Sequence, residues 1–181
     1  MARIKYLDRE AMSPQQAEVY DEAKELGGPV GGPYYAYIYT PEIFRQSQHL
    51  RHCMQQGPLT GREKQLVNIV IARHWDARYP WFAQVRGALQ VGLDREIIDA
   101  VNARQKPALA DPREAACYAV ASEMLATHRI SDATYRNAEK VLGLTDLIYT
   151  VTMVGQFSMT CTTANAFEID PPADQPISLT E

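Results

Sequence analysis

The sequence predicts an all-α fold. Capping and turn residues divide the chain into segments of helical length, apolar residues recur at helical spacing within them, and no segment shows the alternation of a strand. The 181 residues suffice for one domain with its own core, and we see no internal repeat. We therefore expect a single domain over residues 1–181, with an N-terminal arm at 1–12 and an extended tail at 173–181 that lies across a neighbouring surface.

The first half of the chain has clear helix boundaries. Ser13 is placed to cap a helix, Pro14 stands at its first position and Gly27 ends it. Residues 27–40 read as a loop punctuated by glycine and proline, and its tyrosines must pack on something because they would otherwise expose much apolar area. The helices expected in this half cover about 14–26, 41–56, 61–75 and 79–91.

The second half continues the helical pattern. A short helix begins at Asp94, and Asp111-Pro112, Ser131 and Thr145 open three more, of which the last ends before Asp170. The helix 61–75 is apolar on more than one face and is expected at the centre of the fold. The most apolar segment, 147–167, is interrupted by polar residues, so we interpret it as a buried helix and not as a membrane span.

Composition excludes several kinds of partner and site. The formal charge is −4 and no basic cluster carries interleaved aromatic residues, so neither nucleic acid nor an anionic membrane is an expected partner. Cys53, Cys117 and Cys161 are widely separated, which indicates reduced thiols and, without a secretory segment, a cytoplasmic protein. His49, His52 and Cys53 share helical spacing, but this is a weak metal signal, and a solvated helix face is the simpler interpretation; we expect no metal and no cofactor.

Residues 59–92, LTGREKQLVNIVIARHWDARYPWFAQVRGALQVG, form the most informative stretch. With GGPYYAYIYTPE before it and GLDREIIDAV and SDATYRNAEKVLG after it, the chain resembles the carboxymuconolactone decarboxylase family, which includes the alkylhydroperoxidase D-like proteins. The resemblance spans about residues 28–172. It implies an alkylhydroperoxidase D-like helical domain that forms a homo-oligomer, a trimer or a hexamer.

The reactive residues that the resemblance implies are replaced in this chain. The family's proton-relay glutamate corresponds to Gln65, the two cysteines of its CxxC pair correspond to Ala77 and Pro80, and its histidine corresponds to Gln84. The acid and the base of the decarboxylase branch fall on Pro80 and Gln84 and are missing too. Because a dithiol peroxidase needs two thiols and glutamine does not titrate, a thiol-dependent peroxidase is the least favoured function.

The same register places Gln84 and Gln65 as the candidate catalytic residues. Both would face one pocket, where uncharged amides can stabilise a developing enolate or carboxylate charge; the alternative is a polar subunit contact. His52, Tyr149 or a tyrosine of the loop is the candidate proton carrier, although aromatic packing is the more common use of a tyrosine such as Tyr149. Residues expected to contact the substrate, or in the case of Trp81 to be part of the core, are Trp81, Tyr34, Tyr35 and Tyr79.

The resemblance and the residues together predict a small-molecule enzyme. It would act on a small organic acid or lactone by proton transfer, decarboxylation or isomerisation in a mostly uncharged pocket. The alternative is a non-catalytic family member that binds a small aromatic ligand.

Overall fold

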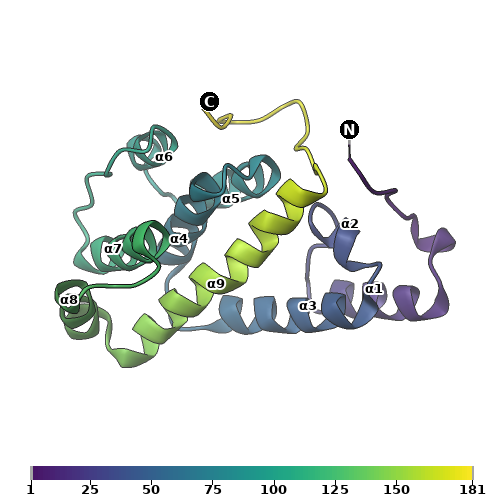
Figure 1. Ribbon diagram of the computed structural model, residues 1–181, viewed down its shortest axis with the longest axis horizontal. Helices are drawn as coiled ribbons and strands as arrows, with labels where there is room; N and C mark the ends of the chain where they lie inside the picture. Colours follow the sequence, from purple (N-terminus) through teal and green to yellow (C-terminus); the bar gives the residue numbers. More distant parts are fainter. Residues whose placement is uncertain (1, 181) are drawn as a thin grey trace.

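The computed structural model describes residues 2–180, and all of its regular elements are helical (Figure 1). The predicted fold class is therefore confirmed. A short 3-10 helix, Arg9–Ala11, precedes the α-helices. These are α1 (Pro14–Glu25), α2 (Tyr34–Tyr37), α3 (Pro41–Gln56), α4 (Gly61–His74), α5 (Arg78–Gln90), α6 (Arg95–Asn102), α7 (Pro112–Thr127), α8 (Asp132–Leu142) and α9 (Leu144–Ala166).

Most helix starts follow the predicted capping residues. Ser13 and Thr60 form reciprocal capping boxes at α1 and α4, because each hydroxyl accepts an amide N–H while a side chain three residues later binds back. Asp111 accepts two amide N–H groups at α7. The predicted cap of the last helix is wrong by two residues: Gly143, at φ +81°, caps α9, and Thr145 lies inside it. Residues 34–37, expected in a loop, form the single turn α2.

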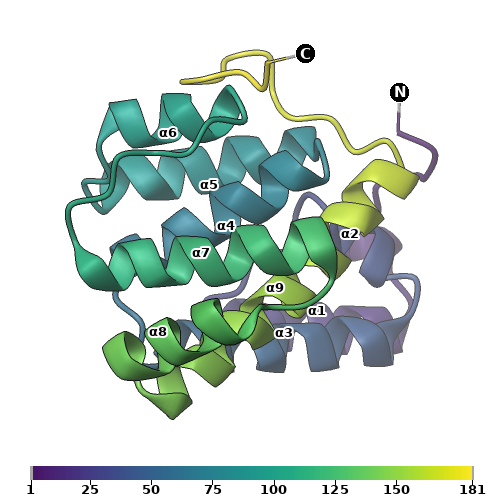
Figure 2. The ribbon, with the colours of Figure 1, turned by 60° about the vertical axis from the view of Figure 1, so that its left-hand side comes forward.

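Helix α4 occupies the centre of the molecule, as its apolar pattern predicts. It packs against α5, α6, α7 and α9, and Figure 2 shows it between α5 and α7. Its residues 66, 67, 69, 71 and 72 are fully enclosed. A helix surrounded by other helices must be apolar on all sides, which accounts for the sequence of this segment.

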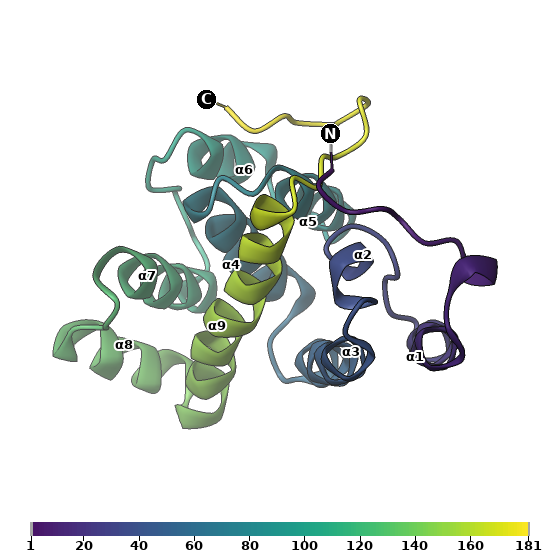
Figure 3. The same cartoon turned by 45° about the vertical axis from the view of Figure 1, so that its right-hand side comes forward.

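The N-terminal helices form a second, smaller cluster. Figure 3 shows α1, α2 and α3 on one side of α9, with α7 and α8 on the other. Phe44 of α3 and Tyr34 and Tyr37 of α2 pack together with α1. Arg45 of α3 forms ion pairs with carboxylates of α1 at 2.8 and 2.9 Å. Helix α1 is thereby fixed against α3.

The C-terminal tail lies across α5 and α6 of its own chain. Trp81 Nε1 donates to the Ile177 carbonyl at 3.0 Å, and Asn102 Nδ2 donates to the Ser178 carbonyl at 2.9 Å. Ile177 is itself buried in the core. Over residues 2–180, no helix combines the length and the apolar content that a membrane crossing needs.

Candidate functional site

A cavity of about 200 Å³ lies where α3, α4, α5 and α9 meet the loop that precedes α2. This is smaller than the ~300–1,000 Å³ of sites for drug-sized ligands, so the cavity suits a small molecule. Its lining is apolar with several neutral polar groups. The lining residues are Pro29, Gly31, Pro33, Tyr34, Arg51, Met54, Gln55, Asn68, Tyr79, Pro80, Ala83, Gln84, Met153, Gln156, Phe157 and Thr160.

Gln84 lines the cavity, but its partner is Asn68 and not the predicted Gln65. Asn68 Nδ2 donates to Gln84 Oε1 at 3.1 Å. Gln65 lies instead against Gly87, where a Cβ atom would be only 2.8 Å from Gln65 Nε2. Helices α4 and α5 run antiparallel. Asn68 faces Gln84, so Gln65, three residues earlier on α4, faces Gly87, three residues later on α5. The expected common cavity for the two glutamines is therefore not found, and Gln65 is not among the lining residues.

Two predicted substrate-contacting tyrosines, Tyr34 and Tyr79, line the cavity. Tyr34 is 5% exposed, and burial raises the pKa of its phenol to about 12. Burial also raises the pKa of Tyr79. The Tyr79 ring lies over Gly32, which has φ +63°, and a Cβ atom there would be 2.1 Å from Tyr79 Cε1. Glycine at position 32 thus permits the positive φ of the turn and leaves space for the Tyr79 ring.

Arg51 of α3 is the single charged residue among those lining the cavity. Its Nε donates to Gln48 Oε1 and its Nη2 to the Gly27 carbonyl, each at 3.3 Å. Within residues 2–180 it forms no ion pair with a carboxylate. The residues Arg51 and Asn68 were not among the sequence-predicted site residues. Asn68 could have been found by counting the antiparallel register from Gln84.

The two predicted proton carriers do not line the cavity. His52 follows Arg51 directly, and about 100° of helical rotation turns it away from the cavity. Tyr149 packs against Gly57, and its hydroxyl lies 4.0 Å from Cys53 Sγ. Their predicted role therefore finds no support in their positions. No group of three potential metal ligands occurs in the part of the chain that the structure describes.

The two other aromatic candidates also lie outside the lining. Trp81 is fully buried and supports the C-terminal tail, in agreement with the alternative that it belongs to the core. Tyr35 stacks on Tyr6 of the N-terminal arm, with ring centroids 3.9 Å apart. It lies close to the cavity wall at Gly31, where a Cβ atom would be 3.3 Å from its hydroxyl.

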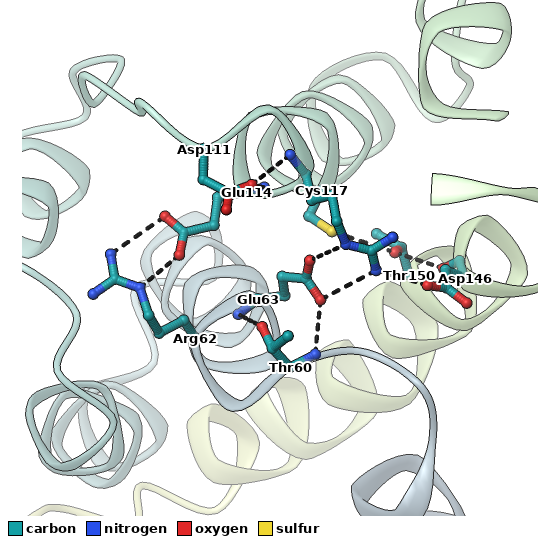
Figure 4. A network of polar contacts seen from close by, with 9 residues as sticks. Thr60, Arg62, Glu63, Asp111, Glu114, Cys117, Asp146 and Thr150 are labelled. Atoms are coloured by element: carbon teal, nitrogen blue, oxygen red, sulfur yellow. Dashed lines mark hydrogen bonds and ion pairs between the residues drawn. The ribbon is translucent and has the colours of Figure 1, made fainter. Parts of the chain in front are cut away.

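A second group of polar residues, on α4, α7 and α9, is fully paired (Figure 4). Glu63 accepts from Arg113 Nε at 2.7 Å and from the Thr60 amide at 2.7 Å, and it is only 3% exposed. Arg113 also donates to Asp146 at 2.7 Å. Beside it, Arg62 binds Glu114. We call these residues the ion-pair network, and their mutual neutralisation indicates a structural role.

Residues 41–123 match the model of the carboxymuconolactone decarboxylase family. This part of the chain belongs to that family. The fold is similar to that of an uncharacterised peroxidase-related protein from Ralstonia eutropha JMP134, described as an alkylhydroperoxidase AhpD core. The TM-score is 0.75 with 16% sequence identity, and the alignment covers 95% of this chain and 93% of the other. No curated protein matches the sequence.

The structure locates the positions that correspond to the family's reactive residues. Ala77 is buried at the start of α5, and Pro80 lines the cavity. Cys53 is exposed and Cys117 and Cys161 are buried, all as free thiols. None of the three is among the lining residues, so the polar groups of the lining side chains are amides, phenols, the hydroxyl of Thr160 and one guanidinium.

Proposed function

We propose that the cavity binds a small organic acid or lactone and promotes proton transfer, decarboxylation or isomerisation by hydrogen bonding. The observation that carries the proposal is the Asn68–Gln84 amide pair in the cavity wall. Because Gln84 Oε1 accepts from Asn68, the Gln84 Nε2 group is oriented as a donor. It has no hydrogen-bond partner among the described residues. A preorganised donor in a water-poor site stabilises negative charge that develops on a substrate oxygen.

The proton donor in this proposal is a tyrosine of the cavity wall, in place of His52 or Tyr149. A phenol whose pKa burial has raised stays protonated at neutral pH, so it can donate a proton but is a poor base. Tyr79 is suited to this role, because its hydroxyl forms no hydrogen bond within residues 2–180 and its ring is fixed over Gly32. A reaction that needs a donor, such as protonation of an enolate, fits the site better than one that needs a base.

The test is turnover of a panel of small carboxylic acids and lactones. For a substrate found in this way, Gln84→Leu should lower kcat by about 10²-fold, since one lost oxyanion donor costs about that much. Gln90→Leu is the matched control, because Gln90 is an exposed residue on the same helix and does not line the cavity. Turnover of no panel member, or equal kcat in both variants, would contradict the proposal.

One observation favours the alternative of a non-catalytic binding protein. No residue among the lining set is of a type that titrates near neutral pH, so the cavity holds no evident general base. Saturable ligand binding without turnover of any panel member would support this alternative.

We further propose that the chain assembles into a homo-oligomer. The apolar residues of α4 are buried within a single copy, but Leu144, Ile148 and Met159 of α9 are 54%, 55% and 38% exposed. Their spacing places them on one face of the helix. Such a stripe is typical of a subunit contact. A stable 20.3 kDa monomer in light scattering would contradict the proposal.

A further inference from the structure

The cavity wall contains two strong hydrogen-bond donors that the protein itself leaves free. Arg51 contacts only neutral oxygen atoms, both at 3.3 Å, and its Nη1 group has no described partner. The Tyr34 hydroxyl likewise forms no hydrogen bond with residues 2–180, although its side chain is only 5% exposed. Neither group is a fully buried atom that lacks a partner, and both belong to residues that line the cavity, so a ligand in the cavity can accept hydrogen bonds from both.

Arg51 is held in position by residues that do not neutralise it. Gln48 accepts from Arg51 Nε, and Gln48 Nε2 in turn donates to the Pro29 carbonyl at 2.5 Å. Gln48 is 1% exposed, and the close approach of Gly28 leaves no space for a Cβ atom, which would be 2.2 Å from Gln48 Oε1. The guanidinium is therefore oriented before any ligand arrives, which reduces the entropic cost of binding.

Arg51 and Tyr34 act on each other electrostatically. Both line the same cavity, and the charge of Arg51 partly opposes the effect of burial on the pKa of Tyr34. A guanidinium with a neighbouring hydroxyl matches the two oxygen atoms of a carboxylate. The remaining wall offers apolar surface from Met54, Met153 and Phe157.

We propose that Arg51 and Tyr34 form a carboxylate-binding site, and that the ligand is a monocarboxylate with a small, mostly apolar body. A single guanidinium neutralises one negative charge, so a second carboxylate would lie unpaired in the cavity and would weaken binding. The inference rests on the proposed function for the location of the site. It goes further by selecting acids over neutral lactones and by assigning Tyr34 to binding, which leaves Tyr79 for proton donation.

The experiment is isothermal titration calorimetry of the full chain with benzoate, and with benzamide and methyl benzoate as neutral analogues of the same shape. Benzoate should bind saturably at millimolar concentration or below, and the neutral analogues should bind at least roughly tenfold more weakly, since a hydrogen bond to a charged group is worth more than a neutral one. Phthalate, with two carboxylates, should also bind more weakly than benzoate.

Substitutions test which residues bind the carboxylate. Arg51→Gln should weaken benzoate binding roughly 10- to 100-fold and leave benzamide binding unchanged, and Tyr34→Phe should weaken benzoate binding by a smaller factor. Arg51→Lys keeps the charge and should give an intermediate affinity. Arg136→Gln on α8, whose side chain is 71% exposed and outside the lining, is the matched control. Thermal unfolding of each variant verifies that it is folded.

The outcomes separate this inference from the proposed function. Equal affinity for benzoate and benzamide, absence of benzoate binding, or benzoate affinity unchanged in Arg51→Gln would overturn the carboxylate site. Benzoate binding that depends on Arg51, together with no turnover of any acid or lactone, would confirm the carboxylate site and contradict only the catalytic proposal.

Discussion

Two half-buried arginines of this protein, Arg113 and Arg51, differ in which groups accept their hydrogen bonds. In the ion-pair network, Arg113 lies between Glu63 and Asp146 at 2.7 Å from each. In the cavity, Arg51 contacts only a glutamine side chain and a backbone carbonyl. The first arrangement joins α7 to α4 and α9, whereas the second leaves a positive charge at the wall of an enclosed space. Whether a charge is paired therefore separates a structural residue from a candidate binding residue better than its burial does.

The largest expected effect comes from breaking the ion-pair network. Arg113→Met should lower the free energy of unfolding by about 3 kcal/mol, because it leaves the carboxylate of the nearly inaccessible Glu63 without its counter-charge. Urea denaturation measures the change. Arg136→Gln removes only an exposed 3.6 Å pair and should cost at most about 0.5 kcal/mol. Equal losses of unfolding free energy in both variants would show that the network contributes no more to stability than an exposed ion pair does.

Alkaline pH tests the same region through Cys117, whose sulfur lies 3.8 Å from Thr150 Oγ1 beside the network. Burial raises the pKa of this thiol from 9.0 to about 12. The unfolded chain therefore ionises first, so the contribution of Cys117 to stability is complete below pH 9.0 and is lost progressively between pH 9.0 and about 12.

The expected slope is about 1.4 kcal/mol per pH unit for this group. Urea denaturation at several pH values should show a smaller loss in Cys117→Ala than in the wild type. A slope that is equal in both proteins would contradict the assignment to Cys117.

A pair of glycines tests how closely the cavity wall is packed. Gly32 and Gly92 both have positive φ, +63° and +73°, so alanine at either position should cost about 1 kcal/mol of backbone strain. Only at Gly32 would the new Cβ atom collide with the Tyr79 ring; at Gly92 nothing lies within 4 Å. Gly32→Ala should therefore be the less stable variant in thermal unfolding, and it alone should weaken ligand binding. Matching ligand affinities in the two variants would show that Tyr79 is not held by this contact.

The smallest expected effect completes the comparison. Arg51→Gln should change the free energy of unfolding by less than about 0.5 kcal/mol, because Arg51 forms no ion pair with a carboxylate within residues 2–180. The same urea measurements apply. A loss comparable to that of Arg113→Met would show that Arg51 is a structural residue.

Local sequence signals predicted most of the fold because helix boundaries depend on near neighbours. Ser13, Thr60, Asp111 and Ser131 cap the helices that they were expected to cap. The start of α9 was misplaced because the positive φ of Gly143, which ends one helix and begins the next, outweighs the capping preference of a nearby threonine.

The cavity could be predicted only in part because it depends on how helices rotate against one another. Gln84 was found through the family register, but its partner depends on the antiparallel match of α4 and α5, which selects Asn68 over Gln65. Likewise, the rotation of α3 turns Arg51 toward the cavity and His52 away from it. Residue chemistry alone favoured His52 as a site residue. Only tertiary packing determines that its neighbour Arg51 lines the cavity instead.

The tail that crosses α5 also gives the protein an optical signal. The chain has two tryptophans. Trp81 is fully enclosed and bonded to the tail, whereas Trp75 is 38% exposed and donates to Ser158 on α9. An indole shielded from water emits at shorter wavelength than one in contact with water, so the two residues should contribute separable bands to the intrinsic fluorescence. Release of the tail would shift only the shorter-wavelength band, that of Trp81. Movement of α9 would alter the longer-wavelength band, that of Trp75.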